Sequence, residues 1–426
     1  MNIPVKNLPR VVIIGGGFGG MALAREIRDK NFQTVLLDKH NYHTFQPLLY
    51  QVATSGLEPD SIAYPLRKIF SSKKHFHFRV AEVEKVNTDE QIVNTNIGPI
   101  HYDYLVIATG TGTNFFGNEK IKKHAMPMKS VPEALNLRSL ILENFEKALL
   151  TKDIEERTKL MNFVIVGGGP TGTELAGALA ELKSHVLPND YPDLDLRLMQ
   201  IHLLEAGGSL LAGMSEKSAE KAEKYLEELG VQVWLNTMVK DFDGNIAQTS
   251  KGELESKTLI WAAGVQARPI DGINKDVLLK NGRYKVDEIN RVVGYQNIFA
   301  LGDVAAMQTE HYPNGHPQVA QPAIQQGEHL AKNLLKLQKG KNTTPFKYND
   351  LGSMATVGRN RAVVDLNNIS LGGALAWFIW MFIHLIALVG FRNKMVTLIN
   401  WTYAYVKYDK GARLIIRPFE KKKGHV

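Results

Sequence analysis

Short runs of apolar residues, each ended by turn-forming residues, recur along the first 110 positions of the chain. They cover residues 10–14, 34–38 and 104–108. Because consecutive rather than alternate positions are apolar, these runs predict parallel strands that are buried on both faces. Residues 21–29 predict a helix between the first two strands. Residues 75–96 alternate apolar and polar side chains, which predicts antiparallel strands.

The same strand–glycine–helix pattern returns at residues 163–182, so that Gly167 stands 152 positions after Gly15. A repeat of this length is typical of two tandem nucleotide-binding domains rather than of a short solenoid repeat. The segments predicted around the second copy are helices at 131–150, 215–230 and 322–337, strands at 201–207, 258–265 and 297–305, and a hairpin at 352–366.

Both copies carry glycines in the spacing G-x-G-x-x-G. These are Gly15, Gly17 and Gly20 in the first copy, and Gly167, Gly169 and Gly172 in the second. The first glycine permits a tight turn, the second lets the backbone approach a pyrophosphate, and the third lets the helix pack closely on the strand. An acid at the end of the next strand binds the adenosine ribose, and Asp38 and Glu205 hold these positions. Both copies follow a predicted strand, open a predicted helix and precede a strand that ends in an acid. Two dinucleotide sites are therefore a better explanation than a chance spacing of glycines.

The two acids lie at different distances from their loops. Asp38 follows Gly20 by 18 residues, whereas Glu205 follows Gly172 by 33, and we assign the extra length to a helix-and-loop insertion over residues 183–200. A carboxylate at this position repels a 2'-phosphate, so Glu205 favours NAD over NADP. Because a flavin can take two electrons from NADH and pass them to another acceptor, we predict FAD at the first loop and NADH at the second.

Composition excludes several kinds of chemistry. The 426 residues include no cysteine, so disulfides, thiolate metal sites and thiol redox catalysis are excluded. A chain of this length is expected to form two or three domains. Its first ten residues lead into a short apolar run without the features of a secretory signal, so we expect a cytoplasmic protein.

Positive charge is concentrated at the C-terminal end. Residues 392–426 hold nine Lys or Arg against two Asp or Glu, so +7 of the net charge of +8 falls there. This segment follows residues 372–391, in which His384 is the only ionisable side chain. Because the basic segment adjoins the most apolar stretch of the chain, an anionic lipid surface is favoured over nucleic acid as its partner.

The apolar stretch 372–391 has two interpretations. Twenty helical residues cover about 30 Å, which is enough to span a bilayer. However, residues 393–408 mix Trp401 and three tyrosines, including Tyr403, with lysines, which is typical of a helix that lies in the membrane interface. A spanning helix would also carry the basic end to the far side, against the positive-inside tendency. We therefore favour interfacial attachment.

Several segments, taken in order, resemble the type II NADH:quinone oxidoreductases, which are single-chain respiratory flavoenzymes that do not pump protons. They are "GGGFGG", "FQPLLYQVATSG", "LVIATG", "VGGGPTGTELAG", "WAAGV", "LGDVA", "AQPAIQQGEHLAKN" and "GFRNKMVTLINWTYAYVKYDKGARLI". The resemblance implies an α/β fold with two Rossmann-like domains and C-terminal membrane-attachment helices. It implies an FAD domain in two parts (1–117 and 293–350), a connector (118–160), an inserted NADH domain (161–292) and a membrane-associating, dimerising region (351–426).

The resemblance also assigns cofactor contacts. Asp303 would bind the ribityl and phosphate end of FAD, with a helix N-cap as the alternative. The segment "FQPLLYQVATSG" would line the isoalloxazine, with a structural helix–loop as the alternative. The FAD residues are Gly15, Gly16, Gly17, Phe18, Gly19, Gly20, Asp38, Lys39, Gln46, Val83, Thr109, Gly110, Asp303, Ala323 and Ile324. The NADH residues are Gly167, Gly169, Thr171, Gly172, Glu205, Ala263 and Gly264, and no metal site is implied.

Three residues carry the implied chemistry. Glu174 would face the nicotinamide and relay a proton in quinone reduction, or else complement the helix dipole. Gln321 and Gln325 are four positions apart, so they share a helix face. In the family this face approaches the quinone head group; a pair of solvated glutamines is the alternative. Pro322 lies inside this motif and fits a helix start.

The resemblance implies an enzyme that oxidises NADH through FAD and reduces a membrane quinone without proton pumping. We expect a homodimer attached peripherally to the cytoplasmic face of the cell membrane, with residues 371–426 on an anionic lipid surface and no nucleic-acid partner. The alternatives are an NADH reductase of a soluble protein acceptor or of oxygen, and a non-catalytic FAD/NADH redox sensor. Sulfide:quinone oxidoreductases and disulfide reductases are excluded because they require redox cysteines.

Overall fold

A computed structural model describes residues 1–366, 369–408 and 411–416 of the chain. The chain folds as two compact units, each assembled from three separate segments. Unit 1 contains residues 1–43, 64–112 and 265–350. Unit 2 contains residues 44–63, 113–264 and the described residues from 351 on.

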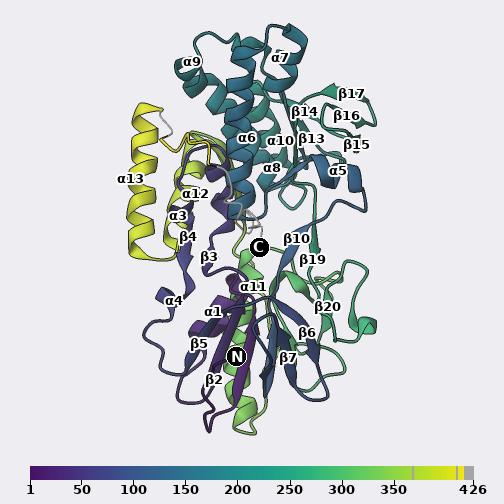
Figure 1. Cartoon of the computed structure of the whole chain (residues 1–426), viewed down its shortest axis with the longest axis vertical. Helices are drawn as coiled ribbons and strands as arrows, with labels where there is room; N and C mark the ends of the chain where they lie inside the picture. The colour runs from purple at the N-terminus through teal and green to yellow at the C-terminus, as the bar shows by residue number, and fades with distance from the viewer. Residues whose placement is uncertain (367–368, 409–410, 417–426) are drawn as a thin grey trace, which may run out of the picture. The chain divides into compact units, whose positions relative to one another are not determined.

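Two short ribbons lie where the chain passes from one unit to the other (Figure 1). They pair β3 (Tyr42–Thr44) with β4 (Ala63–Pro65), and β10 (Thr111–Thr113) with β19 (Val265–Ala267).

Unit 1 is built on a parallel sheet in the order β21–β9–β1–β2–β5. Its strands are β1 (Arg10–Ile14), β2 (Gln33–Asp38), β5 (Phe76–Val80), β9 (Tyr104–Ile107) and β21 (Ile298–Ala300). The central strands are buried along their length, which confirms the strands predicted at 10–14, 34–38 and 104–108. Phe78 and its neighbours were expected in an antiparallel pair, but β5 joins this sheet in parallel. Because β5 is an edge strand with partial burial, its side chains alternate as in an antiparallel strand.

Two helices of unit 1 pack closely together. Helix α1 (Phe18–Glu26) crosses from β1 to β2 and lies against α11 (Ala320–Gln338). A Cβ on Gly327 would stand 2.5 Å from the carbonyl oxygen of Gly19, so this glycine permits the contact. Helix α1 starts three residues before the prediction because the glycine motif forms its first turn. Helix α11 includes Pro322 in its first turn, where the missing N–H costs no helix hydrogen bond.

The rest of unit 1 consists of short elements. They are the antiparallel strands β6 (Val83–Asn87), β7 (Ile92–Thr95) and β8 (Ile100–His101), the parallel pair β20 (Tyr284–Val286) and β22 (Ala305–Met307), helix α4 (Leu66–Ile69), and the turns η4 (Lys275–Val277) and η5 (Gly302–Val304). Strands β6 to β8 confirm the antiparallel prediction for the later part of 75–96.

Unit 2 repeats the parallel design in the order β11–β18–β12–β13–β14. Its strands are β11 (Met126–Pro127), β12 (Phe163–Val166), β13 (Ile201–Leu204), β14 (Gln232–Trp234) and β18 (Thr258–Trp261). An antiparallel sheet adds β15 (Val239–Phe242), β16 (Ile246–Thr249) and β17 (Gly252–Glu255).

The helices of unit 2 include those predicted at 131–150, at 215–230 and after the second glycine loop. They are α2 (Leu49–Ala53), α3 (Pro59–Ile62), α5 (Glu119–His124), α6 (Val131–Leu150), α7 (Ile154–Met161), α8 (Pro170–Glu181), α9 (Leu187–Asp190) and α10 (Glu216–Glu228), with the turns η1 (Gln46–Leu48), η2 (Leu182–Val186) and η3 (Leu196–Leu198). Helix α6 has the predicted bounds, because the Ser130 hydroxyl accepts from the amide of Glu133 as an N-cap. Helix α8 continues through the π-helical turn η2 into α9, which forms the predicted insertion.

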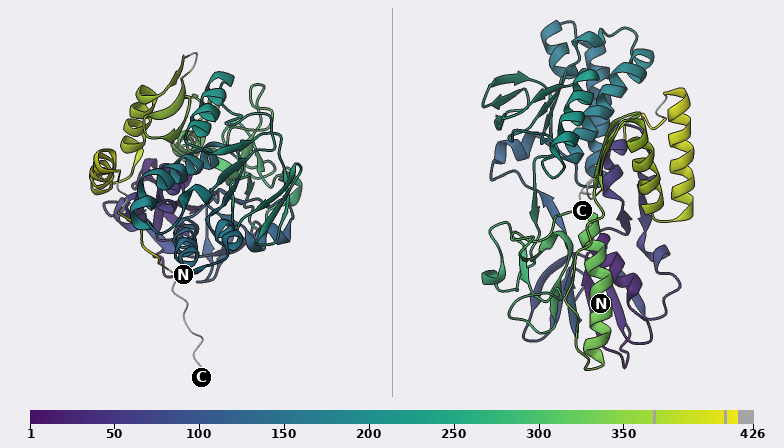
Figure 2. Two further views of the ribbon diagram at one scale, coloured as in Figure 1. Left: turned by 90° about the horizontal axis from the view of Figure 1, so that it is seen from above. Right: turned by 180° about the vertical axis from the view of Figure 1, so that it is seen from behind.

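The C-terminal part of unit 2 begins with an antiparallel sheet of β23 (Ser353–Gly358), β24 (Arg361–Leu366) and β25 (Ile369–Gly372). It confirms the hairpin expected at 352–366. Helices α12 (Ala374–Ala387) and α13 (Phe391–Lys407) follow and contact one another, as the two yellow helices show (Figure 2).

The apolar stretch 372–391 does not form one helix of twenty residues. Helix α12 ends at Ala387 because Leu388 is extended and Gly390 has a φ of +87°, a conformation that suits glycine. Within the described ranges, the structure contains no helix that combines the length and the apolar character needed to cross a bilayer.

Candidate functional site

The two glycine loops have the same geometry, one in each unit. Gly15 and Gly167 have φ of +107° and +110°, and a Cβ on either would stand within 2.8 Å of the backbone of the neighbouring strand end. A Cβ on Gly20 or Gly172 would stand 1.9 Å from the carbonyl oxygen of the first glycine of its loop. A side chain at these positions would therefore force each helix away from its strand.

The N-terminus of the helix that follows each loop has no side-chain cap among the described residues. Gly17 and Gly169 are the N-cap residues of α1 and α8. A Cβ on Gly17 or Gly169 would meet nothing within 4 Å. Exposed amides at a helix N-terminus attract phosphate, so both loops fit a pyrophosphate.

The two predicted acids close their loops in matching ways. Asp38 Oδ2 accepts from the amide of Gly16 at 2.6 Å, and Glu205 Oε2 accepts from the amide of Gly168 at 2.6 Å. The second carboxylate oxygen of each acid accepts from the amide two residues further on, at 2.7 Å. Each carboxylate is thus fixed beside a glycine loop at the end of the adjacent strand, where a ribose hydroxyl could reach it.

Most of the other predicted FAD residues gather around the loop in unit 1. Asp303 accepts from the Thr111 hydroxyl at 3.0 Å, and it lies within η5 rather than at an N-cap. The segment at Thr109 and Gly110 follows β9 directly beside Gly15. Ala323 on α11 packs against Gly19 and Gly302, and Ile324 follows it. Lys39 is exposed and Val83 is half-buried, whereas Gln46 lies in unit 2.

His43 belongs to the first loop, although sequence reasoning did not select it. Its Nδ1 donates to the carbonyl of Gly16 at 3.0 Å, and its ring stands edge-on to Phe18 at 5.0 Å. Burial lowers the pKa of His43 to about 4, so the ring is neutral near pH 7. Its buried Nε2 has no hydrogen-bond partner among the described residues. A polar ligand at this loop would supply that partner.

Gln321 and Gln325 share one face of α11, as predicted, and both contact the segment that follows the helix in unit 1. The Tyr348 hydroxyl donates to Gln321 Oε1 at 3.2 Å. The amide of Gln325 both donates to the carbonyl of Asn349 at 2.8 Å and accepts from its N–H at 3.0 Å. The Gln325 side chain therefore fixes the backbone at Asn349.

The predicted NADH residues collect around the loop of unit 2. Ala263 follows β18 and lies against Gly167, and Gly264 has a φ of +106°. Thr171 is exposed at the first turn of α8. Together with Gly169, Gly172 and Glu205, these residues surround the second glycine loop.

Glu174 is buried in the second turn of α8, with 7 % of its surface exposed. Burial raises the pKa of its carboxyl well above the ordinary value, and contacts with the Thr356 backbone and the Trp380 side chain offset this only in part. Burial therefore favours the protonated, uncharged form of this acid. This environment does not match the alternative of a charged acid that complements the helix dipole.

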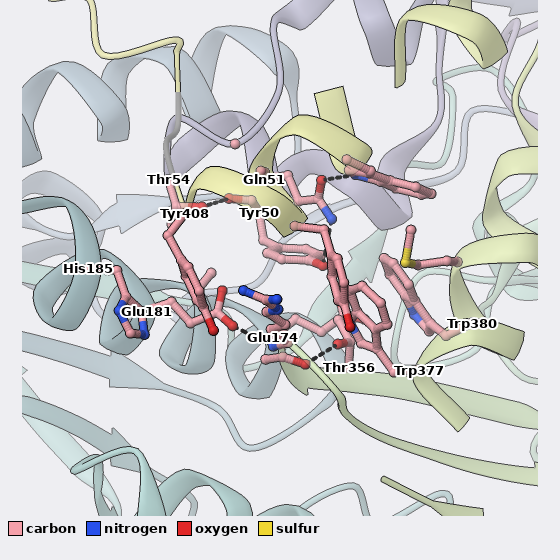
Figure 3. A pocket seen from close by; sticks show the side chains of 18 of the residues that line it. Tyr50, Gln51, Thr54, Glu174, Glu181, His185, Thr356, Trp377, Trp380 and Tyr408 are labelled. Atoms are coloured by element: carbon pink, nitrogen blue, oxygen red, sulfur yellow. Dashed lines mark hydrogen bonds between the residues drawn. The ribbon is translucent and has the colours of Figure 1, made fainter. Parts of the chain in front are cut away.

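Glu174 lines a cavity of about 120 Å³ within unit 2 (Figure 3). The walls come from α2, α8 with η2, β23, α12 and α13. Tyr50, Trp377, Trp380 and Trp401 give it an aromatic lining.

Sequence reasoning missed this cavity because it placed the aromatic residues of 393–408 in a lipid interface. Trp401 is only 8 % exposed, and its Nε1 donates to Gln51 Oε1 at 2.7 Å. The Arg359 guanidinium lies 3.9 Å from the ring centre of Tyr405 and 4.1 Å from that of Tyr408. Trp401 thus faces the protein interior and Tyr405 is half-buried, whereas Tyr403 is 52 % exposed and Tyr408 is 41 % exposed.

Comparison with known proteins places the chain in a family. Residues 9–327 match the pyridine nucleotide-disulphide oxidoreductase family, and residues 351–407 match the NDH2 C-terminal domain. The chain is 37 % identical to a type II NADH:quinone oxidoreductase of Mycobacterium tuberculosis, over 94 % of this chain and 89 % of that protein. It is 30 % identical to the type II NADH:quinone oxidoreductase of Haemophilus influenzae, over 85 % and 88 %.

A solved structure has the same fold. NDH2 of Plasmodium falciparum in complex with NADH superposes with a TM-score of 0.87 at 22 % identity, covering 96 % of this chain and all of that one. The fold is thus that of two-dinucleotide flavoproteins, as predicted. Within that class, the chain belongs to the type II NADH:quinone oxidoreductases, which confirms the resemblance.

Proposed function

We propose that this protein oxidises NADH and reduces a quinone to quinol, with FAD as the resident flavin and without proton pumping. The main observation behind this proposal is that the chain, a member of this family, has two glycine loops of the same geometry. In each loop an acid accepts a hydrogen bond from the amide of a loop glycine. The loop in unit 1 would hold FAD, and the loop in unit 2 would bind NADH. When bound, FAD supplies a carrier that takes two electrons from NADH and delivers them to the quinone.

The chain's own residues position the reactants and supply a proton. Glu174 holds a proton in a buried site, which suits it to act as an acid toward the quinone. Gln321 would present its amide to a quinone carbonyl without adding charge. Gln325 would support it by fixing the segment that carries Tyr348, through its two bonds to Asn349.

Membrane attachment belongs to the same proposal. Helix α12 exposes Leu375, Phe378, Phe382 and Ile386, which lie three or four residues apart on one helix face. Helix α13 exposes an apolar row that includes Ile399. These faces support interfacial attachment and, with the basic residues of 371–426, contact with anionic lipid. The cytoplasmic side of the membrane remains the side proposed from the sequence. Residues 409–410 and 417–426 of that segment lie outside the described ranges.

Two further assignments also rest on the resemblance. The homodimer is proposed through the C-terminal region. The division into an FAD domain, a connector, an NADH domain and a C-terminal region remains the one expected from the sequence.

The proposed activity is tested by NADH oxidation with detergent-purified protein, with and without added quinone. We expect a burst that stalls without quinone and continuous turnover with it. Steady oxidation that ignores quinone would instead indicate oxygen or a soluble protein as the acceptor. Binding of NADH without turnover under either condition would indicate a redox sensor.

Glu205→Gln is expected to lower the preference for NADH over NADPH by about tenfold, which corresponds to about 1.4 kcal/mol. The amide removes the charge that repels a 2'-phosphate and keeps an oxygen that can accept from Gly168. The ratio of kcat/KM for the two nucleotides is the measurement. Asp38→Asn is the matched control in the other loop. It should weaken flavin retention and leave the ratio unchanged, and an unchanged ratio in Glu205→Gln would remove the role of this acid.

Replacing Phe382 and Ile399 together by serine is expected to lower the affinity for anionic vesicles by about a hundredfold or more, because each buried side chain contributes about 1.5–3 kcal/mol. Both side chains are exposed, at 64 % and 60 %, so the fold should persist. Vesicle flotation measures the effect. Leu150→Ser, at a position 85 % exposed on α6, is the control. Equal flotation of all variants would contradict the assignment.

A further inference from the structure

One face of α8 and η2 carries a row of titratable side chains. Glu174, Glu181 and His185 stand at positions i, i+7 and i+11, and all three line the same cavity (Figure 3). Their exposure increases along the row: Glu174 is buried, Glu181 is half-buried and His185 is exposed. The row therefore leads from solvent to the buried acid.

Tyr50 on α2 lines the same cavity and lies near both acids of this row. Its hydroxyl accepts from Gln51 Nε2 at 2.9 Å, and Gln51 is in turn held by the indole of Trp401. The hydrogen of the phenol is therefore free to point elsewhere. Burial and the nearby carboxyl groups of Glu174 and Glu181 raise the pKa of Tyr50, so the phenol keeps its proton.

The cavity has room for ordered water between these groups. A bound water needs about 10–15 Å³ and two to four polar partners, and the cavity measures about 120 Å³. The indole Nε1 of Trp380 is buried in the same cavity wall. It lies close enough to Glu174 to favour the charged carboxylate. Water in this space would link the indole, the phenol and the carboxyl groups.

The other titratable and charged groups described around the cavity contact its walls and lie outside the row of Glu174, Glu181 and His185. The Arg359 backbone N–H donates to Glu181 Oε1, and its guanidinium lies against Tyr405 and Tyr408 of α13. His384 of α12 stacks on Trp380 and hydrogen-bonds the Trp380 carbonyl at 2.8 Å. Burial lowers its pKa to about 4, so it stays neutral near pH 7. None of these groups interrupts the row from His185 to Glu174.

We propose that Glu181, Tyr50 and the cavity water form a proton path. A proton from solvent would enter this path beside His185 and reprotonate Glu174. The path rests on the proposed function. Reduction of a quinone takes two electrons and two protons, and NADH supplies both electrons but only one of the protons, as hydride. The second proton must come from water.

The path delivers one proton for each proton that it takes from solvent. Glu174 gives its carboxyl proton to the quinone and takes the phenolic proton of Tyr50. Glu181 takes a proton from solvent and gives it to the cavity water, and the water in turn gives a proton to the Tyr50 oxygen. One proton is thus taken from solvent, and every side chain ends in its starting form.

Tyr50→Phe and Glu181→Gln test the path. Phenylalanine keeps the ring, and glutamine keeps an oxygen for the Arg359 amide. Each variant should lower steady-state quinone reduction by about tenfold, with a greater loss as pH rises and an enlarged rate difference between H₂O and D₂O. Rapid reduction of the flavin by NADH should stay within twofold of the wild type, because that step needs no proton from this path.

Tyr191→Phe is the matched control, since it removes a half-buried bond from a tyrosine hydroxyl to Glu146 outside the cavity. It should leave turnover and pH profile unchanged. Wild-type turnover and pH profile in both cavity variants would overturn the path. A matching fall in flavin reduction by NADH would also overturn it, by assigning the residues to nucleotide binding. If the wild type itself ignores quinone, the proposed function fails, and that result is visible without any variant.

Discussion

Glu174→Gln is expected to slow quinone reduction by about a hundredfold or more, within the range typical of general acid catalysis. The substitution keeps the size of the side chain and removes the proton that this buried group holds. Reduction of the flavin by NADH should change only a few fold. Stopped-flow absorbance separates the two half-reactions. Equal losses in both would show that Glu174 acts on nucleotide binding rather than as the acid.

The same substitution should change how stability depends on pH. Burial raises the pKa of Glu174 in the folded state, so the folded protein binds this proton more tightly than the unfolded chain does. The free energy of unfolding therefore falls as pH rises from the ordinary glutamate range through the folded pKa. Glutamine does not titrate, so the variant should lose less stability between pH 5 and pH 9. Parallel stability profiles for the two proteins would contradict the raised pKa.

Gly177→Ala is expected to lower the free energy of unfolding of unit 2 by about 3 kcal/mol, the upper end of the usual cost of overpacking. A Cβ at this position would stand 1.6 Å from the carbonyl oxygen of Val357 and 2.5 Å from its carbonyl carbon. Both atoms are backbone, so relief requires α8 and β23 to separate. Because β23 also carries Thr356 against Glu174, the buried site would loosen as well.

Gly213→Ala is the matched control for this prediction, since a Cβ at Gly213 meets nothing within 4 Å. Urea unfolding followed by tryptophan fluorescence compares the two variants. A stability of Gly177→Ala equal to that of the control would show that α8 and β23 are not held at this distance in solution.

The dinucleotide loops could be predicted from the sequence because their determinants are local. Gly15 and Gly167 are needed for a conformation within one turn, and Asp38 and Glu205 each stand at the end of the next strand. The central parallel strands could also be predicted, because a strand that is buried on both faces is apolar at consecutive positions. The exception, β5, shows the limit: an edge strand has the alternation of an antiparallel one.

The cavity around Glu174 could not be predicted in this way, because its walls come from segments far apart in the chain. Trp401 and Gln51 are separated by 350 positions and meet through one hydrogen bond. Tryptophan and tyrosine suit a lipid interface and a protein interior equally well. Only the packing of α12 and α13 decides that Trp380 and Trp401 turn inward while Phe382 faces outward.

The division of unit 1 into three segments has a consequence for its synthesis. Strand β9 ends at Ile107, but its neighbour β21 begins at Ile298, and α11 covers α1 only from Ala320 on. At a translation rate of about 5–20 residues per second, the sheet, which lacks only one of its five strands, waits roughly 10 to 50 seconds for these partners. During that time it presents an unpaired strand edge and an apolar helix face. The nascent chain should therefore depend on chaperones until nearly four-fifths of it has left the ribosome.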